Sequence, residues 1–314
     1  MEANQDSYTE RCGLFGDLPT RMMVWLIRTF PRMPYALEWS LLHLSVLVIF
    51  ILARQQRHAI RENLKHIYPD LSIAEGLWGG FCVLRNFGWT YIDSLRAKLG
   101  QNCVTWELVG EETFQKIKSS REAAILFTTH TGNYDLAACL FAAEFGRTLH
   151  TVRVPERTKK LQKIRQREFE ADMAKYPYFK VHYNTSDNLL GMELVKLLGN
   201  GELLALQCDR VFGDVVGMEV PWSDDVSFRV PMGPMTLASI SKCPCYPLFV
   251  VRGGKRHYKV IFEPALQLDP KVRRPRAMDY ALPWVQRVEG FLRSYSHEWF
   301  VFEQAFSCGH DTKK

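Results

Sequence analysis

The stretch AAILFTTHTGNYDLAACLFAAEFG, residues 123–146, is the part of the sequence that decides the fold. Its first six residues are a continuous run of strand length with little polarity, which is typical of a strand buried on both faces of a sheet. The polar turn THTGN follows it. The alanine-rich residues after the turn end at Gly146, as a helix does. The stretch therefore predicts a buried strand, a tight turn and a helix.

The same alternation continues along the rest of the chain. Three apolar runs predict strands, and the stretches between them predict helices: strands at 149–154, 179–183 and 203–207, and helices at 157–175 and 187–198. Further elements are expected after residue 209: a strand pair near 218–221 and 228–231, a helix at 236–241, strands at 246–252 and 258–264, and a long helix from about residue 278. This order indicates an α/β fold with a mixed central sheet flanked by helices.

A hydrophobic segment precedes this alternation. Residues 39–53, WSLLHLSVLVIFILA, carry no formal charge, but these fifteen residues are fewer than the roughly 20 that a helix needs to cross a bilayer. Arginines stand on both sides, so they indicate no orientation. We expect a membrane anchor in one leaflet or a short tilted span, with a buried core helix as the alternative. Residues 1–60 are then a polar segment with this anchor, and residues 61–314 the α/β domain.

Composition limits the classes of function. The 314 residues carry a formal net charge of +6, which suits a surface that meets nucleic acid, anionic lipid or an acidic carrier protein. No zinc-finger spacing, ribonucleoprotein aromatic motif or basic heptad region is present in the sequence, which argues against nucleic acid. The eight cysteines are scattered without a C-x-x-C pair. We therefore expect no metal site and reduced thiols, as in a cytosolic catalytic domain.

The turn after the first strand holds the candidate catalytic residues. His130 stands at the strand end, Gly132 lets the backbone tighten, and Asp135 falls in the first turn of the helix. A carboxylate that binds one imidazole nitrogen raises the basicity of the other, so the pair can deprotonate an alcohol that attacks a thioester. Backbone N–H groups of Gly132 and Asn133 are candidates to hold the oxyanion. A structural helix cap is the alternative interpretation. Because the turn has no serine or cysteine, we expect direct transfer without a covalent acyl-enzyme.

Four segments stand in an order that resembles a known family: RENLKHIYPDLS (61–72), HTGNYDLA (130–137), GELLALQCDR (201–210) and VPMGPMTLA (230–238). The second of them resembles the H-x4-D/E block of the bacterial late lipid A acyltransferases, the lauroyl and myristoyl group of the lysophospholipid acyltransferase-like superfamily. The likeness covers roughly residues 20–305. It implies transfer of an acyl chain from acyl carrier protein or coenzyme A to a glycolipid hydroxyl at the inner face of the bacterial cytoplasmic membrane, without a cofactor, with His130 and Asp135 as the catalytic pair. Aspartate at position 135, where this branch usually has glutamate, leaves the acceptor open.

Charged residues outside the turn are candidates for substrate binding. Asp209 and Arg210 match the acidic block of the family and would orient the acceptor or brace the cleft; a surface ion pair is the alternative. Arg229 carries the planar fork that suits a phosphate, unless it is a solvated strand residue. Arg153 and Arg165 match positions where the family places cleft arginines.

A basic helix and an aromatic cluster complete the candidates. The helix at 157–175 suits an acidic carrier protein, the phosphates of coenzyme A or anionic lipid, and a solvated helix face is the alternative. Its basic residues are Arg157, Lys159, Lys160, Lys163, Arg165 and Arg167. Aromatic residues at helical spacing either line an acyl groove or pack in the core, and they are Trp78, Phe81, Phe87 and Trp89.

Other functions are compatible with the same residues. Acylation of a lysophospholipid, an ornithine-type aminolipid or an amphiphilic natural product would use the same histidine and carboxylate. A thioesterase would pass the acyl group to water. A catalytically silent, membrane-binding scaffold would keep the fold without the reaction.

Overall fold

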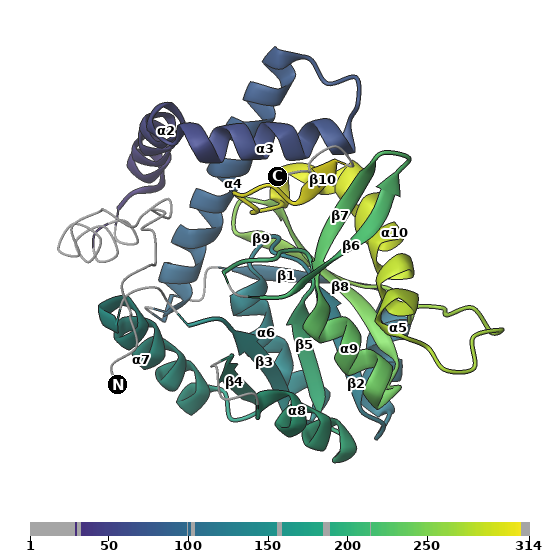
Figure 1. Cartoon of the computed structure of the whole chain (residues 1–314). Helices are drawn as coiled ribbons and strands as arrows, with labels where there is room; N and C mark the ends of the chain where they lie inside the picture. Colours follow the sequence, from purple (N-terminus) through teal and green to yellow (C-terminus); the bar gives the residue numbers. More distant parts are fainter. Residues whose placement is uncertain are drawn as a thin grey trace, which may run out of the picture.

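The computed structural model describes residue 29 and residues 33–308, with the exception of residues 99, 102–103, 156–158, 185–188 and 214. A seven-stranded sheet forms its centre, with helices on both faces (Figure 1). The strands follow in the order β1 (Thr105–Val109), β9 (His257–Phe262), β8 (Cys245–Gly254), β2 (Ala124–Thr128), β5 (Leu203–Gln207), β3 (Leu149–Arg153) and β4 (Phe179–Tyr183). Only the β8–β9 pair is antiparallel within this sheet. The predicted α/β class with a mixed sheet is confirmed.

Strand β2 lies in the middle of the sheet and is buried on both faces. Ile125 and Phe127 pack against one layer of helices, whereas Ala124 and Leu126 pack against the other. The first layer contains α8 (Leu190–Gly199), α9 (Met232–Ser241) and α10 (Ala277–Tyr295), and the second contains α5 (Glu111–Ser119), α6 (Tyr134–Ala142) and α7 (Lys159–Lys175). A strand with apolar contacts on both faces needs the continuous apolar run that the sequence shows.

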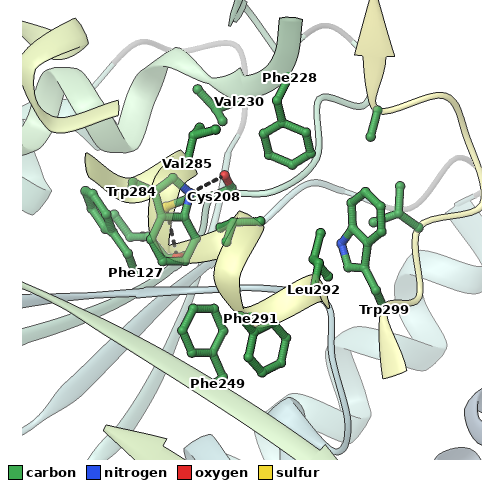
Figure 2. Packing of buried hydrophobic residues seen from close by; sticks show 14 of the residues in the cluster. Phe127, Cys208, Phe228, Val230, Phe249, Trp284, Val285, Phe291, Leu292 and Trp299 are labelled. Atoms are coloured by element: carbon green, nitrogen blue, oxygen red, sulfur yellow. Dashed lines mark hydrogen bonds between the residues drawn. The ribbon is translucent and has the colours of Figure 1, made fainter. Parts of the chain in front are cut away.

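The core of the first layer is built around Trp284 of α10 (Figure 2). Its ring contacts Phe127 of β2 and Phe249 of β8, at centroid distances of 5.6 Å and 5.8 Å. Its indole N–H donates a hydrogen bond of 2.8 Å to the carbonyl oxygen of Cys208. This bond satisfies a donor that would be costly to bury alone. It also fixes the backbone directly before Asp209.

A second sheet and the C-terminal segment cover one end of the domain. β10 (Phe306–Cys308), β7 (Val226–Pro231) and β6 (Gly217–Ser223) form an antiparallel sheet in this order. The buried Asn63 ties the segment before β10 to the N-terminal helices, because its side-chain amide donates to the carbonyl oxygen of Glu303 and accepts from the N–H of Ala305. Residues 299–300 pass beside the turn that follows β2.

Three helices precede the central sheet: α2 (Tyr35–Leu52), α3 (Arg54–Ile67) and α4 (Ile73–Lys98). In the described part of the chain, α2 is the one helix that is long and apolar enough to cross a membrane. It overlaps the expected anchor at residues 39–53. The division of the chain at residue 60 falls within α3 and stays a prediction.

Helix α9 corrects one expected boundary. The sequence pattern predicted this helix from residue 236, whereas it begins at Met232 and includes Pro234. Proline is tolerated there because the first N–H groups of a helix have no partner within the helix. The expected helices at 157–175 and 187–198 begin at Lys159 and Leu190, and residues 157–158 and 187–188 lie outside the described residues.

Candidate active site

His130 stands in the turn between β2 and α6. Its side chain is 14% exposed, and the edge of its ring packs against Tyr134 at a centroid distance of 5.6 Å. Gly132 has a φ of +51°, and a Cβ at this position would lie 2.5 Å from the carbonyl oxygen of Val250. Only glycine meets both conditions without displacing β8. The tight turn predicted from the sequence therefore has a steric cause.

Asp209 binds the imidazole of His130. The carboxylate Oδ1 lies 2.7 Å from Nδ1, and Oδ2 accepts a hydrogen bond of 2.8 Å from the backbone N–H of His130. The two residues meet because β5 runs parallel to β2 as its neighbour, so that both strands end at the same edge of the sheet. Since an ionised carboxylate only accepts hydrogen bonds, Nδ1 carries the proton and Nε2 of the neutral ring is left as a base.

Trp299 completes the surroundings of Asp209. Its indole N–H donates a hydrogen bond of 2.8 Å to Oδ2, and both side chains are buried. Burial raises the pKa of Asp209, but the positive charge that His130 carries when it is protonated and the hydrogen bonds from His130 and Trp299 outweigh it, so the pKa of Asp209 lies below its ordinary value. Asp209 is thus held as a carboxylate. Sequence reasoning missed Trp299 because the contact joins residues that are 90 positions apart.

Backbone contacts hold the histidine turn from the same side. Phe300 donates its N–H to the carbonyl oxygen of His130 at 2.8 Å, and Thr131 forms an antiparallel bridge with Trp299. Asn133 caps α6 by accepting from the N–H of Leu136, and its Oδ1 also accepts from the hydroxyl of Ser94. Asn133 and Gly132 are both buried. Their expected role as oxyanion donors stays a prediction.

Asp135 corrects the pairing that we expected from the sequence. Its carboxylate forms an ion pair with Arg153, at the end of β3, while the imidazole of His130 binds Asp209. The reason is the strand order: β5 lies beside β2 and brings Asp209 to the imidazole, whereas the carboxylate of Asp135, in the first turn of α6, reaches Arg153 of β3. Arg153 also stacks over the ring of Phe169 at 4.2 Å. A catalytic role of Asp135 stays a prediction, but it does not act through a direct hydrogen bond to the imidazole in this structure.

A small, mostly apolar cavity of about 40 Å³ lies between α6 and the sheet, with Asp135 and Arg153 among the residues that line it. Polar side chains stand at the carboxyl edge of the sheet, and they are Thr128, Tyr134, Asp135, Arg153 and Gln207. Apolar side chains line the rest, among them Ala137, Phe141, Phe145, Leu149, Phe179 and Phe262. The cavity volume of about 40 Å³ is too small for a fatty acyl chain unless the lining side chains move apart.

The chain matches the family model of the bacterial lipid A biosynthesis acyltransferases over residues 19–307. It belongs to this family. A search of curated proteins found no match. The matched region contains every residue of the site described above, and the resemblance stated from four sequence segments is confirmed. Family membership assigns this protein to acyl transfer in lipid A biosynthesis, with an acyl donor and a lipid acceptor, and together with the apolar helix α2 it indicates association with a membrane.

The other predicted substrate-binding residues of this acyltransferase, Arg210, Arg229 and Arg165, lie outside the cavity lining, each in a different environment. Arg210 forms an ion pair with Glu303 at 3.0 Å. Arg229 is exposed on β7, where its backbone N–H binds Ala305. Arg165 forms an ion pair with Glu168 on α7. Burial lowers the pKa of Arg153, but the charge of Asp135 outweighs it together with the smaller opposing effect of the nearby Arg165 charge, so the pKa of Arg153 lies above its ordinary value. On α7, Lys163 and Arg167 are exposed, and Arg157 lies outside the described residues.

The aromatic candidates divide between core and surface. Trp89 is buried, and Phe87 packs edge-to-face against Phe300 and Phe302, so these two residues belong to the core. Trp78 is 61% exposed and stacks on Phe81. These residues belong to α4, whereas the lining of the cavity comes from α6 and the sheet.

Proposed function

We propose that this family member transfers a fatty acyl group from an acyl carrier protein or coenzyme A thioester to a hydroxyl of a lipid A-type glycolipid. Family membership supports the reaction class. The observation that carries the chemistry is the 2.7 Å hydrogen bond between His130 Nδ1 and the buried carboxylate of Asp209, because it leaves Nε2 free to act as a base. The proposed reaction uses no cofactor or metal ion.

The proposed reaction has two steps: the acceptor hydroxyl attacks the thioester, and the thiolate then leaves. Nε2 of His130 accepts the proton of the acceptor hydroxyl while its oxygen attacks the thioester carbonyl, and the resulting imidazolium is stabilised by the charge of Asp209. The tetrahedral intermediate then collapses: the C–S bond breaks, and the imidazolium returns the proton to the leaving thiolate. The N-terminus of α6, with the N–H groups of Gly132 and Asn133, supplies partial positive charge for the oxyanion. The products are an ester and a free thiol.

Asp135 and the arginines beside it bind the donor in this proposal. Asp135 and Phe169 fix the guanidinium of Arg153 at the mouth of the cavity, and Arg165 adds a second positive charge nearby. Two guanidinium groups suit the phosphate of the phosphopantetheine arm that both donors share. Arg210 and Arg229 remain candidates for phosphates of the acceptor headgroup.

In this proposal the acyl chain enters between α6 and the sheet, where the side chains around the cavity of about 40 Å³ move apart to admit it. The polar mouth at Asp135 and Arg153 and the apolar side chains beyond it support this direction. The thioester carbonyl then stays at the carboxyl edge of the sheet, where His130 stands. Because acyl carrier protein and coenzyme A are both cytosolic, we propose that the domain works on the cytoplasmic side of the bacterial inner membrane.

Transfer of labelled acyl groups tests the proposal directly. Labelled acyl-carrier protein and acyl-coenzyme A are offered separately with a panel of membrane lipids, to the parent protein and to His130→Ala. Loss of the base lowers the rate by about 10² to 10⁴. His257→Ala is the matched control, since His257 is a half-exposed histidine on β9 that pairs with Glu107. Undiminished transfer by His130→Ala would remove His130 from the mechanism.

One sequence feature favours a second acceptor class. Position 135 holds aspartate, as in glycerolipid acyltransferases, where the lipid A branch usually has glutamate. A lysophospholipid, an aminolipid or an amphiphilic natural product would be acylated by the same base. Lipid profiles of cells with and without the protein separate the two: loss of an acyl chain from lipid A supports the first acceptor, and an unchanged lipid A with another lipid missing supports the second.

A further inference from the structure

Helix α2 presents apolar side chains over most of its circumference. Exposed large apolar side chains lie along the whole helix, with exposed fractions from 46% to 74%: Leu37, Trp39, Leu44, Leu47, Val48, Ile51 and Leu52. Only a narrow stripe faces the protein, with Glu38, Leu42 and Val46 buried at intervals of four residues. When a helix is apolar all round but packs against the protein along one stripe only, its other faces are suited to contact with lipid chains.

The folded domain holds α2 at both of its ends. Near the first end, the carboxylate of Glu38 is fully buried and binds Arg96 of α4 and Arg256 at the β8–β9 turn, each at 2.9 Å. At the other end, the ring of Phe50 packs edge-to-face on Phe81 of α4 at 5.9 Å. These contacts, with Leu42 and Val46 packed near Gly88 between them, place α2 along α4. α2 lies at the edge of the molecule (Figure 1).

This attachment is incompatible with a helix that crosses the bilayer. At 1.5 Å per residue, the 18 residues of α2 extend about 27 Å, slightly less than the roughly 30 Å of a hydrocarbon core. Crossing would carry the adjoining part of α4 into the hydrocarbon together with buried charges such as Asp93 and Arg96. Helix α3 also starts at Arg54, directly after α2, and turns back onto the domain through Ile60 and Leu64.

The first turns of α4 extend the same apolar surface. Ile73 is 68% and Trp78 is 61% exposed, and Trp78 stacks on Phe81, the residue that contacts Phe50 of α2. Exposed cations stand near both ends of α2: Lys255 lies 3.5 Å above the ring of Tyr35, and Arg54 follows the last turn. Cations at both ends suit a helix whose two ends meet the headgroups of one leaflet.

We propose that this protein is monotopic, with α2 lying in the plane of an anionic phospholipid leaflet and the first turns of α4, with Ile73 and Trp78, entering the same leaflet as a second contact. The exposed face of α2 meets the acyl chains, while Lys255 and Arg54 meet the headgroups. Attachment of this kind does not depend on which lipid is acylated, so it stands or falls separately from the acyl transfer proposed above.

Topology in sealed vesicles distinguishes an in-plane helix from a spanning one. Epitopes at the two ends of the full chain are exposed to protease in membrane vesicles of either orientation. An in-plane helix leaves both epitopes on one side, so that both are digested in one preparation and protected in the other. Digestion of the two epitopes in opposite preparations would show that the chain crosses the membrane and would overturn the proposal.

Flotation with vesicles tests the second contact. The full chain is mixed with vesicles of phosphatidylglycerol and phosphatidylethanolamine. The double variant Ile73→Glu, Trp78→Glu is expected to float several-fold less than the parent protein. Ile240→Glu, which changes an exposed isoleucine on α9, is the control and floats like the parent. Unfolding temperatures exclude misfolded variants. If the folded double variant floats like the parent protein, α4 does not contact the membrane. If the parent protein binds equally well to vesicles of phosphatidylcholine, the cations do not select an anionic leaflet.

Discussion

The variant Asp209→Asn tests whether Asp209, and not Asp135, orients the imidazole of His130. The carboxylate of Asp209 accepts three hydrogen bonds: Oδ1 accepts from Nδ1 of His130, and Oδ2 accepts from the backbone N–H of His130 and from the indole N–H of Trp299. An asparagine of the same shape has one oxygen and one NH₂ group. Two donors face the position of Oδ2, so the amide oxygen is expected there and the NH₂ group faces Nδ1.

An NH₂ group at Nδ1 reverses the tautomer of His130. Nδ1 must then accept a hydrogen bond, the proton moves to Nε2, and Nε2 can no longer take a proton from the acceptor hydroxyl. In serine proteases, the same replacement of the aspartate behind the catalytic histidine by asparagine lowers kcat by about 10⁴. We expect a loss of about 10³ to 10⁴ in the transfer rate of Asp209→Asn, with little change in KM for the donor, because Asp209 is fully buried and does not touch substrate.

The assay is steady-state acyl transfer over a range of pH, with Asp135→Asn as the comparison. Asp135 pairs with Arg153, so its replacement is expected to raise KM for the donor and to leave kcat largely unchanged. A strong loss of kcat in Asp135→Asn together with a nearly normal Asp209→Asn would refute the pairing of His130 with Asp209. Far-ultraviolet circular dichroism confirms that both variants are folded.

Three further perturbations follow from the structure. Gly132→Ala places a Cβ 2.5 Å from a backbone oxygen of β8 and is expected to abolish transfer and to lower the unfolding temperature, whereas Gly146→Ala, with a similar φ but no atom within 4 Å, costs only about 1–2 kcal/mol in urea unfolding. Burial raises the pKa of Glu298 to about 7, so the folded state holds this proton more tightly than the unfolded chain, and stability is lost as pH rises from about 4.5 to 7. Glu298→Gln removes this loss, and the difference in unfolding free energy between variant and parent is expected to change by up to about 3 kcal/mol between pH 4 and pH 8; a constant difference would contradict it. Ala137→Phe narrows the cavity and is expected to shift transfer toward shorter acyl chains in a donor panel, while the exposed Ala143→Phe leaves the chain-length profile unchanged.

Much of the fold was predictable because each central strand is a short apolar run between helices. The run at β2 and the helix after it lie within residues 123–146, and both follow from local pattern alone; α6 ends at Ala142, and a 3-10 turn over Ala143–Phe145 leads to Gly146. β1 and β10 were not predicted. TWELV at residues 105–109 alternates between exposed and half-buried positions at the edge of the sheet, and β10 has three residues that are strand only because β7 offers a partner. Edge strands are specified by their neighbours more than by their own residues.

The pairing of His130 shows why local spacing is insufficient for the site. Asp135 is five residues from His130, and this short spacing made it the natural partner. Asp209 is 79 residues away, and the two meet only because β5 lies beside β2, although β3 and β4 come between them in the chain. Strand order therefore decides which carboxylate reaches the imidazole, since neighbouring parallel strands deliver their carboxyl ends to one edge. From the sequence, residues 201–210 predicted a strand followed by Asp209, but not which strand would lie beside it. Once the order is known, Asp135 is left to pair with Arg153, and the proposed base that activates the acceptor hydroxyl is assembled from two strands and the C-terminal segment that carries Trp299.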